Sequence, residues 1–525
     1  MTTTEAASPL THRRIRAVVI GLLIGTFLGA LDTMIMVTAM RTIADELHGL
    51  TMQASVTTAY LIASMISMPL YGKLSDIYGR RRLYLAGISV FLLGSLLCAL
   101  AGDMGQLALF RAVQGLGGGG LMALALAAIA DMVPSEQRTR WQALFGFSFA
   151  AASISGPVLG GLFAGMDSFL GIDGWRWLFL VNLPIGLVTM AVVGKLFTVR
   201  TPRLAQSVDY WGAIALATGL VPLLLLAEQG REWGWTSPAS LSLAAVGVLG
   251  LAVFARVQVR RQDSALLPPK LFRDKAFTLI NLVNFLGGVG VFTALAFVPL
   301  YLQIVQGLSP TAAGLLMLPQ SLATITGSRI VGPLLGKGMR YSRVLAAGLG
   351  LSGSAYLALS LAGPATPMAL ITVLVLANGV GGGMFFQVVL VTLQDAVEPQ
   401  DLGVASSLSG FSRQLGGVAG TAVFLSLVFS TASERITRLF NESLASEQFR
   451  ALVAADPLAR SVIDRPGGVD LNDTSFLSLL DPRVAAPVVE GMSSAMNTVF
   501  LSIGLVVVLA AALALSITPS RKDTP

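Results

Sequence analysis

Two ionisable residues, Asp32 and Arg111, lie inside long apolar segments, where a lone charge is costly. At a helical rise of about 1.5 Å per residue, Asp32 lies about 23 Å into its segment and Arg111 about 7 Å into its own. If the two segments cross a membrane in opposite directions, both side chains reach the outer third of a hydrocarbon layer about 30 Å thick. The pattern predicts an ion pair, or a proton switch in which protonated Asp32 releases Arg111.

Two alternatives to this coupling pair remain open in the sequence. The pair can be static and purely structural, and Arg413, near the middle of residues 403–430, is a rival partner for Asp32. An unpaired charge in such a segment costs roughly 2.5 to 3.5 kcal/mol, so we expect Asp32 to be partnered or neutralised in either case. The two histidines, His12 and His48, fall outside the apolar segments, so a proton relay within them must use carboxylates.

The sequence GKLSDIYGRRR, which begins at Gly72, places one carboxylate and several arginines between two apolar segments. Asp76 can accept hydrogen bonds from amides at a helix N-terminus, and Arg80 can reach a carboxylate on a neighbouring helix, such as Asp131. This cluster predicts a latch that closes the inner face of the protein. The alternative is a loop whose charges are solvated and only set the membrane topology.

Glycine and proline are concentrated in one further apolar segment, residues 141–165, at Gly156, Pro157, Gly160 and Gly161. Proline removes a backbone donor and glycine permits close approach of another helix, so this segment is expected to bend and pack tightly. Generic helix packing is the alternative, because both residue types are common in membrane helices.

The composition identifies the class of protein that must position these residues. The 525 residues are 54% hydrophobic and only 12% charged, which is too apolar for a soluble protein. The net charge of +7 does not indicate a nucleic-acid partner, because the basic residues lie between apolar segments without interleaved aromatic residues. The single cysteine, Cys98, excludes disulfides within the chain and cysteine-ligated metal sites, and we expect no cofactor.

Runs of about 18 or more mostly apolar residues predict fourteen membrane-spanning helices in an all-α protein. They cover residues 17–39, 52–71, 83–101, 107–132, 141–165, 175–195, 211–229, 239–259, 276–304, 310–335, 343–362, 367–392, 403–430 and 492–517. Most of the 35 Lys and Arg residues fall on one side of these helices, so the positive-inside rule places both termini in the cytoplasm. No cleavage site follows the first helix, which is expected to be retained.

An internal repeat divides the chain. The glycine-rich run at residues 114–120 recurs at 378–383, 264 residues later, and the turn at Gly72 has a degenerate counterpart that begins at Gly332. The second copy has no carboxylate matching Asp32 and no arginine matching Arg111, so the ion chemistry is expected in one half only. The predicted parts are a tail (1–16), two six-helix halves (17–195 and 261–517), two linker helices (196–260), an outer segment within the second half (431–491) and a tail (518–525).

Other functional classes have little support in the sequence. The segment GPLLGKG has the wrong spacing for a phosphate-binding loop, which argues against ATP-driven transport by this chain alone. No nucleophile, base and orienting group can be assembled at similar depth in the predicted helices, so an enzyme is not expected.

Several of these segments together resemble the major facilitator superfamily, and specifically its fourteen-span drug:proton antiporter branch. The resemblance covers most of residues 17–430. It is carried by LDTMIMVTAM (31–40), GKLSDIYGRRR (72–82), LFRAVQGLGGG (109–119), GPVLGG (156–161), WRWLFLVNLPIG (175–186), PLYLQIVQGLSPTAAGLLMLP (299–319) and SRQLGGVAG (412–420).

The resemblance implies alternating access, in which protons enter as a small amphiphilic or cationic compound leaves. It makes Asp32 and Arg111 the coupling pair and implies that Gly72, Asp76 and Arg80 form the latch. The acidic partner of this latch falls on Asp131, and GPVLGG corresponds to the antiporter motif. We therefore expect a multidrug efflux protein in a bacterial inner or plasma membrane, in contact with lipid.

Two departures from the family pattern keep other functions open. Val37 and Arg41 stand where the first-helix motif usually has asparagine and proline. The outer segment, residues 431–491, is also longer than usual, which leaves room for a lipid-like substrate or an extracytoplasmic partner protein. The alternatives are an exporter of a lipid or secondary metabolite on the same fold, and a membrane receptor or scaffold that transports nothing.

Overall fold

A computed structural model describes residues 12–47, 52–133, 137, 141, 144–197, 209–262, 265–308, 310–398, 401–455 and 480–517. The described chain is almost entirely helical, with one two-stranded antiparallel hairpin. Its long helices are α1 His12–Glu46, α2 Gln53–Tyr78, α3 Arg80–Ala99, α4 Met104–Met132, α6 Phe145–Ala164, α8 Asn182–Leu196, α9 Tyr210–Trp233, α10 Pro238–Arg261, α11 Lys275–Ile304, α12 Pro310–Gly336, α13 Tyr341–Leu359, α14 Met368–Asp395, α15 Leu402–Leu444 and α18 Pro482–Leu515. The short elements are α7 Trp177–Leu180, α16 Glu447–Ala455, η2 Gly174–Arg176, η4 Leu271–Arg273, β1 Ser168–Phe169 and β2 Ile172–Asp173.

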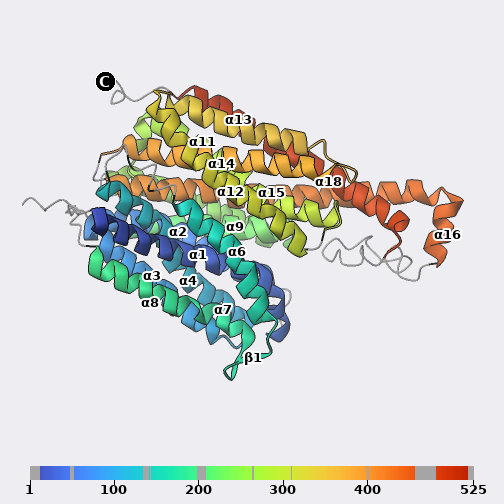
Figure 1. Cartoon of the computed structure of the whole chain (residues 1–525), viewed down its shortest axis with the longest axis horizontal. Coiled ribbons are helices and arrows are strands. Elements are labelled where there is room, and N and C mark those ends of the chain that lie inside the picture. Colours follow the sequence, from blue (N-terminus) through green and yellow to red (C-terminus); the bar gives the residue numbers. More distant parts are fainter. Residues whose placement is uncertain are drawn as a thin grey trace, which may run out of the picture.

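The helices form two bundles that lie side by side and diverge toward one end of the molecule (Figure 1). The first bundle contains α1 to α8 and the second contains α11 to α18, each with its own buried apolar core. Between them in sequence, α9 and α10 pack on each other, and α9 also contacts α2 and α15. This is the expected major facilitator architecture of two six-helix halves with two inserted helices.

The two bundles repeat one another in their closest helix contacts. The glycine run in α4 packs against α2 and α3, and the matching run in α14 packs against α12 and α13. A side chain added at Gly119 would collide with the Ser64 carbonyl oxygen, and one at Gly383 would collide with that of Thr324. The glycines are therefore required for backbone-to-backbone packing, the property that small residues confer on membrane helices.

Eleven of the described helical segments are long and apolar enough to cross a membrane, against the fourteen spans predicted. The other three predicted spans are occupied by α2, α12 and α13, which have 26, 27 and 19 residues. Both α2 and α12 pack against the opposite bundle. A helix that faces protein instead of lipid does not need a uniformly apolar surface, which explains why these two are less hydrophobic.

Three predicted spans have different boundaries in the structure. The sixth is interrupted at Val181, between α7 and α8, where Pro184 removes a backbone donor. The thirteenth continues to Leu444 and the last begins at Pro482, so part of the predicted outer segment belongs to these two helices. At about 1.5 Å per residue, the 43 residues of α15 extend about 64 Å, roughly twice the thickness of a hydrocarbon layer.

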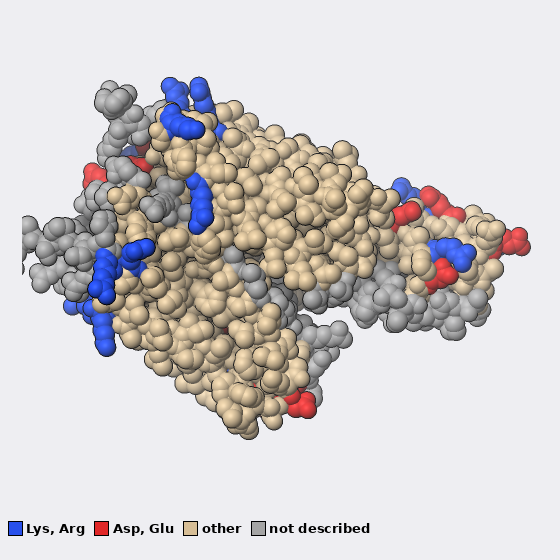
Figure 2. All heavy atoms as spheres, in the orientation of Figure 1, with Lys and Arg blue, Asp and Glu red and all other residues tan. Residues whose placement is uncertain are grey.

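Charged side chains gather at the two ends of the molecule (Figure 2). Lys and Arg residues cluster at the end where the C-terminus lies, and α16 with the adjoining parts of α15 and α18 projects from the opposite end (Figures 1 and 2). The predicted tail at 518–525, residues 1–11 of the other tail and residues 456–479 of the outer segment lie outside the described residues.

Candidate functional site

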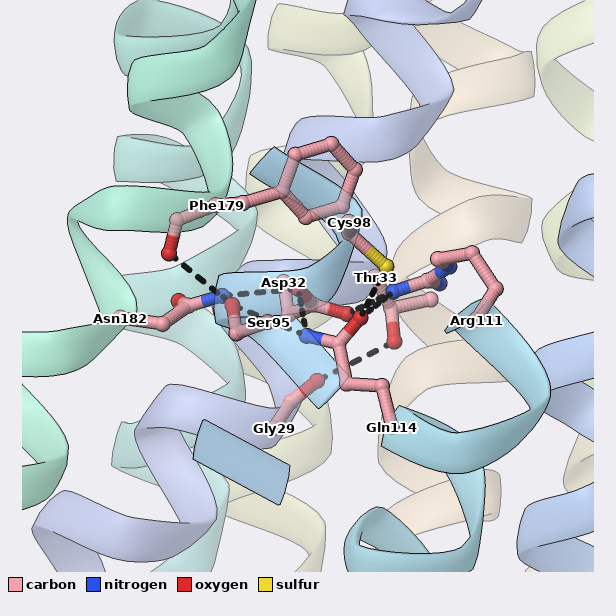
Figure 3. Close-up of polar contacts among 9 residues, drawn as sticks. All are labelled: Gly29, Asp32, Thr33, Ser95, Cys98, Arg111, Gln114, Phe179 and Asn182. Carbon is pink, nitrogen blue, oxygen red and sulfur yellow. Dashed lines mark hydrogen bonds and ion pairs between the residues drawn. The ribbon is translucent and has the colours of Figure 1, made fainter. Parts of the chain in front are cut away.

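Asp32 is the centre of a buried polar cluster inside the first bundle (Figure 3). Its Oδ2 lies 2.5 Å from Arg111 Nη1, and its Oδ1 accepts hydrogen bonds from Gln114 Nε2 at 2.7 Å and Asn182 Nδ2 at 2.9 Å. Asp32 and Arg111 are each 1% exposed. The carboxylate therefore has an arginine and two amides as partners and is sealed from water in this conformation.

Four helices position this cluster. Asp32 is on α1, Ser95 on α3, Arg111 and Gln114 on α4, and Asn182 is the first residue of α8. Ser95 Oγ accepts hydrogen bonds from Asn182 at 2.9 Å and Gln114 at 3.3 Å, and donates one to the Phe179 carbonyl oxygen at 2.9 Å. Phe179 and Asn182 flank the break in the sixth span, and Asn182 points toward Asp32 and Ser95 (Figure 3).

The two amide residues, Gln114 and Asn182, were not assigned a role from the sequence. Both stand within recognised segments, LFRAVQGLGGG and WRWLFLVNLPIG, and both are polar residues in apolar surroundings. That contrast was the available signal, because buried polar side chains in a membrane need partners. Both side chains are fully buried.

The structure separates the two candidate arginine partners of Asp32. Arg111 pairs with the carboxylate and also donates to Gln114 Oε1 at 2.7 Å. Its guanidinium carbon lies 4.1 Å from the centre of the Tyr60 ring on α2. Arg413 lies on α15 in the second bundle, where its guanidinium carbon is 4.4 Å from the centre of the Phe386 ring. The rival pairing of Asp32 with Arg413 is absent from the described residues.

A second charged cluster joins the two bundles at their basic end. Arg80 forms ion pairs with Asp76 and, at 2.8 Å, with Asp131 on α4. Asp76 Oδ2 accepts a hydrogen bond of 3.3 Å from the Val404 amide in the first turn of α15. Buried carboxylates are stabilised at helix N-termini because free N–H groups and the helix dipole both favour negative charge. Gly403 packs directly on Arg80 and Asp76, without room for a side chain.

Gly72 extends this contact between the bundles. A side chain at Gly72 would collide with Ser407 Oγ and the Gly403 carbonyl oxygen, so α2 and α15 touch through their backbones. Further along the same pair of helices, Gln414 Nε2 donates to the Leu61 carbonyl oxygen at 3.4 Å and to Ser64 Oγ at 3.2 Å. The seam between α2 and α15 is thus closed over about 16 Å from the basic end, the length of eleven helical residues.

The predicted antiporter motif lies in the middle of α6. Gly156 is in contact with the Met34 side chain of α1, so a larger residue there would displace this helix pair. Gly160 is buried, whereas Gly161 is exposed and has open space where a side chain would be. Pro157 is within the helix. Asp32 is two residues from Met34 on α1, so the motif packs against the helix that carries the central carboxylate.

Comparison with known proteins identifies the family of this fold. The sequence profile of the Major Facilitator Superfamily matches residues 22–421. The chain is similar to "Multidrug resistance protein 3" of Bacillus subtilis, with 31% identity over 530 residues, covering 100% of this chain and 98% of that protein. It also matches a "Tetracycline resistance determinant" of Streptomyces rimosus at 40% identity over 307 residues, covering 57% of this chain and 88% of that protein.

Solved structures show the same fold at low sequence identity. The human organic anion transporter MFSD10 (TETRAN) superposes with a TM-score of 0.62 at 14% identity, covering 95% of this chain and 99% of that one. The proton:xylose symporter XylE superposes with a TM-score of 0.60 at 16% identity, covering 97% of each chain. At these identities the likeness concerns the fold alone.

Proposed function

This chain belongs to the Major Facilitator Superfamily of membrane transporters, and from that premise we propose that it is a proton-coupled efflux antiporter of small amphiphilic molecules. The observation that carries the proposal is the buried Asp32 carboxylate, held by Arg111 and two amides. Such a group can exist in two charge states, each with different partners. Its protonation is thereby tied to the position of Arg111.

The proton step uses the groups around the carboxylate. A proton that reaches Asp32 from the outer side cancels its negative charge and removes the attraction for Arg111. The amides of Gln114 and Asn182 each carry an acceptor oxygen as well as donors, so they can hydrogen-bond either form of Asp32. Asn182 Oδ1 has no partner among the described residues and is available to accept a hydrogen bond. The two amides can therefore partner Asp32 with or without the proton, as a switch requires.

Movement of Arg111 is coupled to the seam through α2. The Arg111 guanidinium lies against Tyr60, and the next residue, Leu61, accepts the hydrogen bond of Gln414 from the opposite bundle. A displacement of Arg111 therefore acts on the helix that closes the seam. We assign alternating access to rocking of the bundles about this contact.

The cluster of Gly72, Asp76, Arg80 and Asp131, which we call the cytoplasmic latch, holds the inner face shut. The concentration of Lys and Arg at the latch end supports a cytoplasmic location for that end by the positive-inside rule. The conformation seen here, with bundles diverging away from the latch, is then the outward-facing one. Rocking to the inward-facing state has to break the ion pairs of Arg80.

The substrate class follows from the relatives, whose names refer to multidrug and tetracycline resistance. We propose export of small amphiphilic or cationic compounds from a bacterial inner or plasma membrane, driven by inward proton flow. One charge crossing 100 mV supplies about 2.3 kcal/mol, enough for roughly a fifty-fold substrate gradient per proton. The substrate would enter between the bundles and from the surrounding lipid.

The decisive experiment compares the wild-type protein with Asp32→Asn in liposomes that contain a pH-sensitive dye. Adding a lipophilic cation to the wild type should trigger proton flux. Asp32→Asn preserves the shape of the side chain and one acceptor oxygen but cannot take up and release a proton, so this flux should fall to the level of empty liposomes. Loss of flux with unchanged folding, measured by size-exclusion chromatography, supports the antiporter.

Two other outcomes distinguish the alternative functions. Flux retained in Asp32→Asn removes Asp32 from the mechanism. No flux with any compound favours either export of a lipid or secondary metabolite, or a membrane receptor or scaffold.

The projecting part of α15 supports the lipid alternative, because it forms an extended surface beyond the membrane where a lipid or an extracytoplasmic partner can bind. Deleting most of residues 431–491, which include the projecting end of α15, should abolish lipid export in that case and leave drug efflux intact.

A further inference from the structure

Arg413 is a buried cation whose charge has no counterion in the described part of the protein. It is 7% exposed, comparable to Arg80 at 3%, and Arg111 at 1%. Arg80 and Arg111 are both paired with carboxylates, whereas the Arg413 guanidinium contacts the Phe386 ring. An aromatic ring attracts a cation but does not neutralise it. A buried charge in a membrane protein is functional by default, and here its partner is missing.

The sequence of the second half offers Arg413 no carboxylate at its own depth. The acidic residues nearest to it on α15 and its cap are Asp401 and Glu434, about 18 Å and 32 Å away along the helix axis at the α-helical rise. Asp401 is already paired with Lys270 at 3.2 Å. In the first half, Asp32 is committed to Arg111, and its oxygens have three donors. With no free carboxylate near Arg413 among the described residues, we look to a bound molecule for its negative charge.

The position of Arg413 matches that of a substrate site. It lies eleven residues from the start of α15, about 16 Å along the axis, close to the middle of a hydrocarbon layer about 30 Å thick. Its neighbour Gln414 makes the hydrogen bond across the seam to α2, so Arg413 is on the helix that borders both bundles. Transporters of this general construction bind substrate near the midplane, at the interface of their repeats.

We infer that Arg413 and Phe386 form a subsite for an acidic group on an amphiphilic substrate. The guanidinium offers a planar pair of donors that fits a carboxylate or enolate, and the phenyl ring fixes its plane and adds an apolar surface for the attached ring system. The subsite rests on the proposed transport function and narrows it. The preferred substrates then carry both a flat apolar body and an acidic group. Compounds with a permanent positive charge are poorer substrates.

The test is a binding measurement on purified protein in lipid nanodiscs with two matched dyes. One is a rhodamine with a free benzoic acid group, and the other is its methyl ester, which differs by the loss of that charge. For Arg413→Gln we expect the acid dye to bind roughly ten- to a hundred-fold more weakly, as for loss of a charge-assisted hydrogen bond. Binding of the ester should change less than threefold. Arg413→Lys keeps the charge without the planar fork and should be intermediate.

Arg329→Gln is the matched control. Arg329 also lies over a phenylalanine ring, 4.9 Å from the centre of Phe147, and also belongs to a helix that contacts the opposite bundle, but it is exposed. Binding of both dyes should be unchanged in this variant. If Arg413→Gln fails to fold, the ratio of acid to ester affinity in Arg413→Lys decides the question.

Equal weakening of both dyes by Arg413→Gln, no weakening of either, or equal binding of the two dyes to the wild type would overturn the subsite. These results are separable from the proton-flux experiment. Selective acid binding without any proton flux would refute the antiporter and leave the subsite standing. Flux that depends on Asp32, combined with acid binding that ignores Arg413, would refute the subsite alone.

Discussion

The two bundles share a scaffold but differ in what they enclose. Gly115, Gly117 and Gly119 of α4 pack on backbone atoms of α2 and α3, and the residues 264 positions later, Gly379, Gly381 and Gly383, pack on those of α12 and α13. The partner carbonyls are also matched, since Ser64 corresponds to Thr324. The backbone frame has been kept in both halves, because glycine is the residue type that permits such close contact.

The residues that the two bundles enclose differ in chemical character. In the first bundle, α1, α3, α4 and α8 surround the ion pair of Asp32 and Arg111. In the second, α11, α13, α14 and α18 surround a small cavity lined by residues such as Ser352, Tyr356 and Phe385. The position of Arg111 corresponds to Val375. The first half thus encloses a buried ion pair, whereas this cavity in the second half is lined mainly by apolar side chains.

The ends of the bundles repeat this difference in weaker form. Asp395, 264 positions after Asp131, accepts a hydrogen bond of 3.1 Å from the Tyr341 hydroxyl. Arg340, which corresponds to Arg80, is exposed, whereas Arg80 is buried and pairs with Asp131 at 2.8 Å. A hydrogen bond from a neutral hydroxyl opens more readily than a buried ion pair, so the two contacts are expected to differ in strength.

Removing Arg111, the buried partner of Asp32, should cause the largest loss of stability. Arg111→Leu leaves an uncompensated buried carboxylate, which costs about 3 to 5 kcal/mol of stability. Val375→Arg creates the opposite fault in the second bundle, a buried arginine without a carboxylate, and should also destabilise the protein strongly. Thermal unfolding in detergent measures both. The double variant Asp32→Asn with Arg111→Leu removes both charges and should recover most of the loss; a double variant as unstable as the single one contradicts the pairing.

Adding one methyl group to a glycine in the matched contacts of α4 and α14 should destabilise the protein equally in both halves. Gly119→Ala and Gly383→Ala each place a carbon against a backbone carbonyl oxygen, and the forced shift costs about 1 to 3 kcal/mol. The control is Gly350→Ala, because open space surrounds this glycine, and its melting temperature should equal or exceed that of the wild type, since alanine is the better helix former. Sensitivity confined to one half would show that the frames are not equivalent.

The latch should be asymmetric. Asp131→Asn weakens one of the two ion pairs of buried Arg80, whereas Asp395→Asn weakens a hydrogen bond from a neutral hydroxyl to a carboxylate. Both bonds are charge-assisted and worth about 1.5 to 3 kcal/mol, and the ion pair should lie at the upper end of that range. A cysteine introduced by Ser407→Cys, which faces Gly72 across the seam, reports on opening when native Cys98 is replaced by serine. Alkylation of this cysteine should accelerate more for Asp131→Asn. Equal rates in the two variants would count against a dominant first-half latch.

The smallest change in stability is expected at the N-termini of the matched helices α4 and α14. Asp103 caps α4 by accepting a hydrogen bond of 2.8 Å from the Gln106 amide, while the corresponding Pro367 provides no side-chain cap. Asp103→Ala should cost about 0.5 to 2 kcal/mol, and Pro367→Asp should stabilise the protein by a fraction of that amount. Melting temperatures measured side by side test the difference. A lower melting temperature for Pro367→Asp would indicate that this proline has a separate role in the preceding loop.

The fold was largely predictable because hydropathy is a local property. Runs of apolar residues located the membrane helices, and the glycine run identified the repeat without any knowledge of contacts. The prediction failed where the environment of a helix matters, as in the interruption at Val181 and the extension of α15 to Leu444. Pro184 was visible in the sequence, but membrane helices often tolerate proline, so it did not by itself indicate a break.

The candidate site was predictable only in its charged members. Asp32 and Arg111 stand out because ionisable residues are rare in apolar segments. Gln114 and Asn182 do not, because an amide in a membrane helix costs less and its role depends on what it faces. In sequence, they are 82 and 150 residues from Asp32. Local patterns carry no information about contacts at such separations.

The sequence by itself determined the class of the protein, the repeat, the position of each charge along its helix and the lack of second-half counterparts to Asp32 and Arg111. The tertiary structure alone decided that Asp32 pairs with Arg111, that Arg413 is left with an aromatic ring, and that the α15 terminus meets Asp76. The physical reason is that depth follows from counting residues, whereas partnership depends on the rotation and register of helices. Those are set by glycine contacts between segments far apart in the chain.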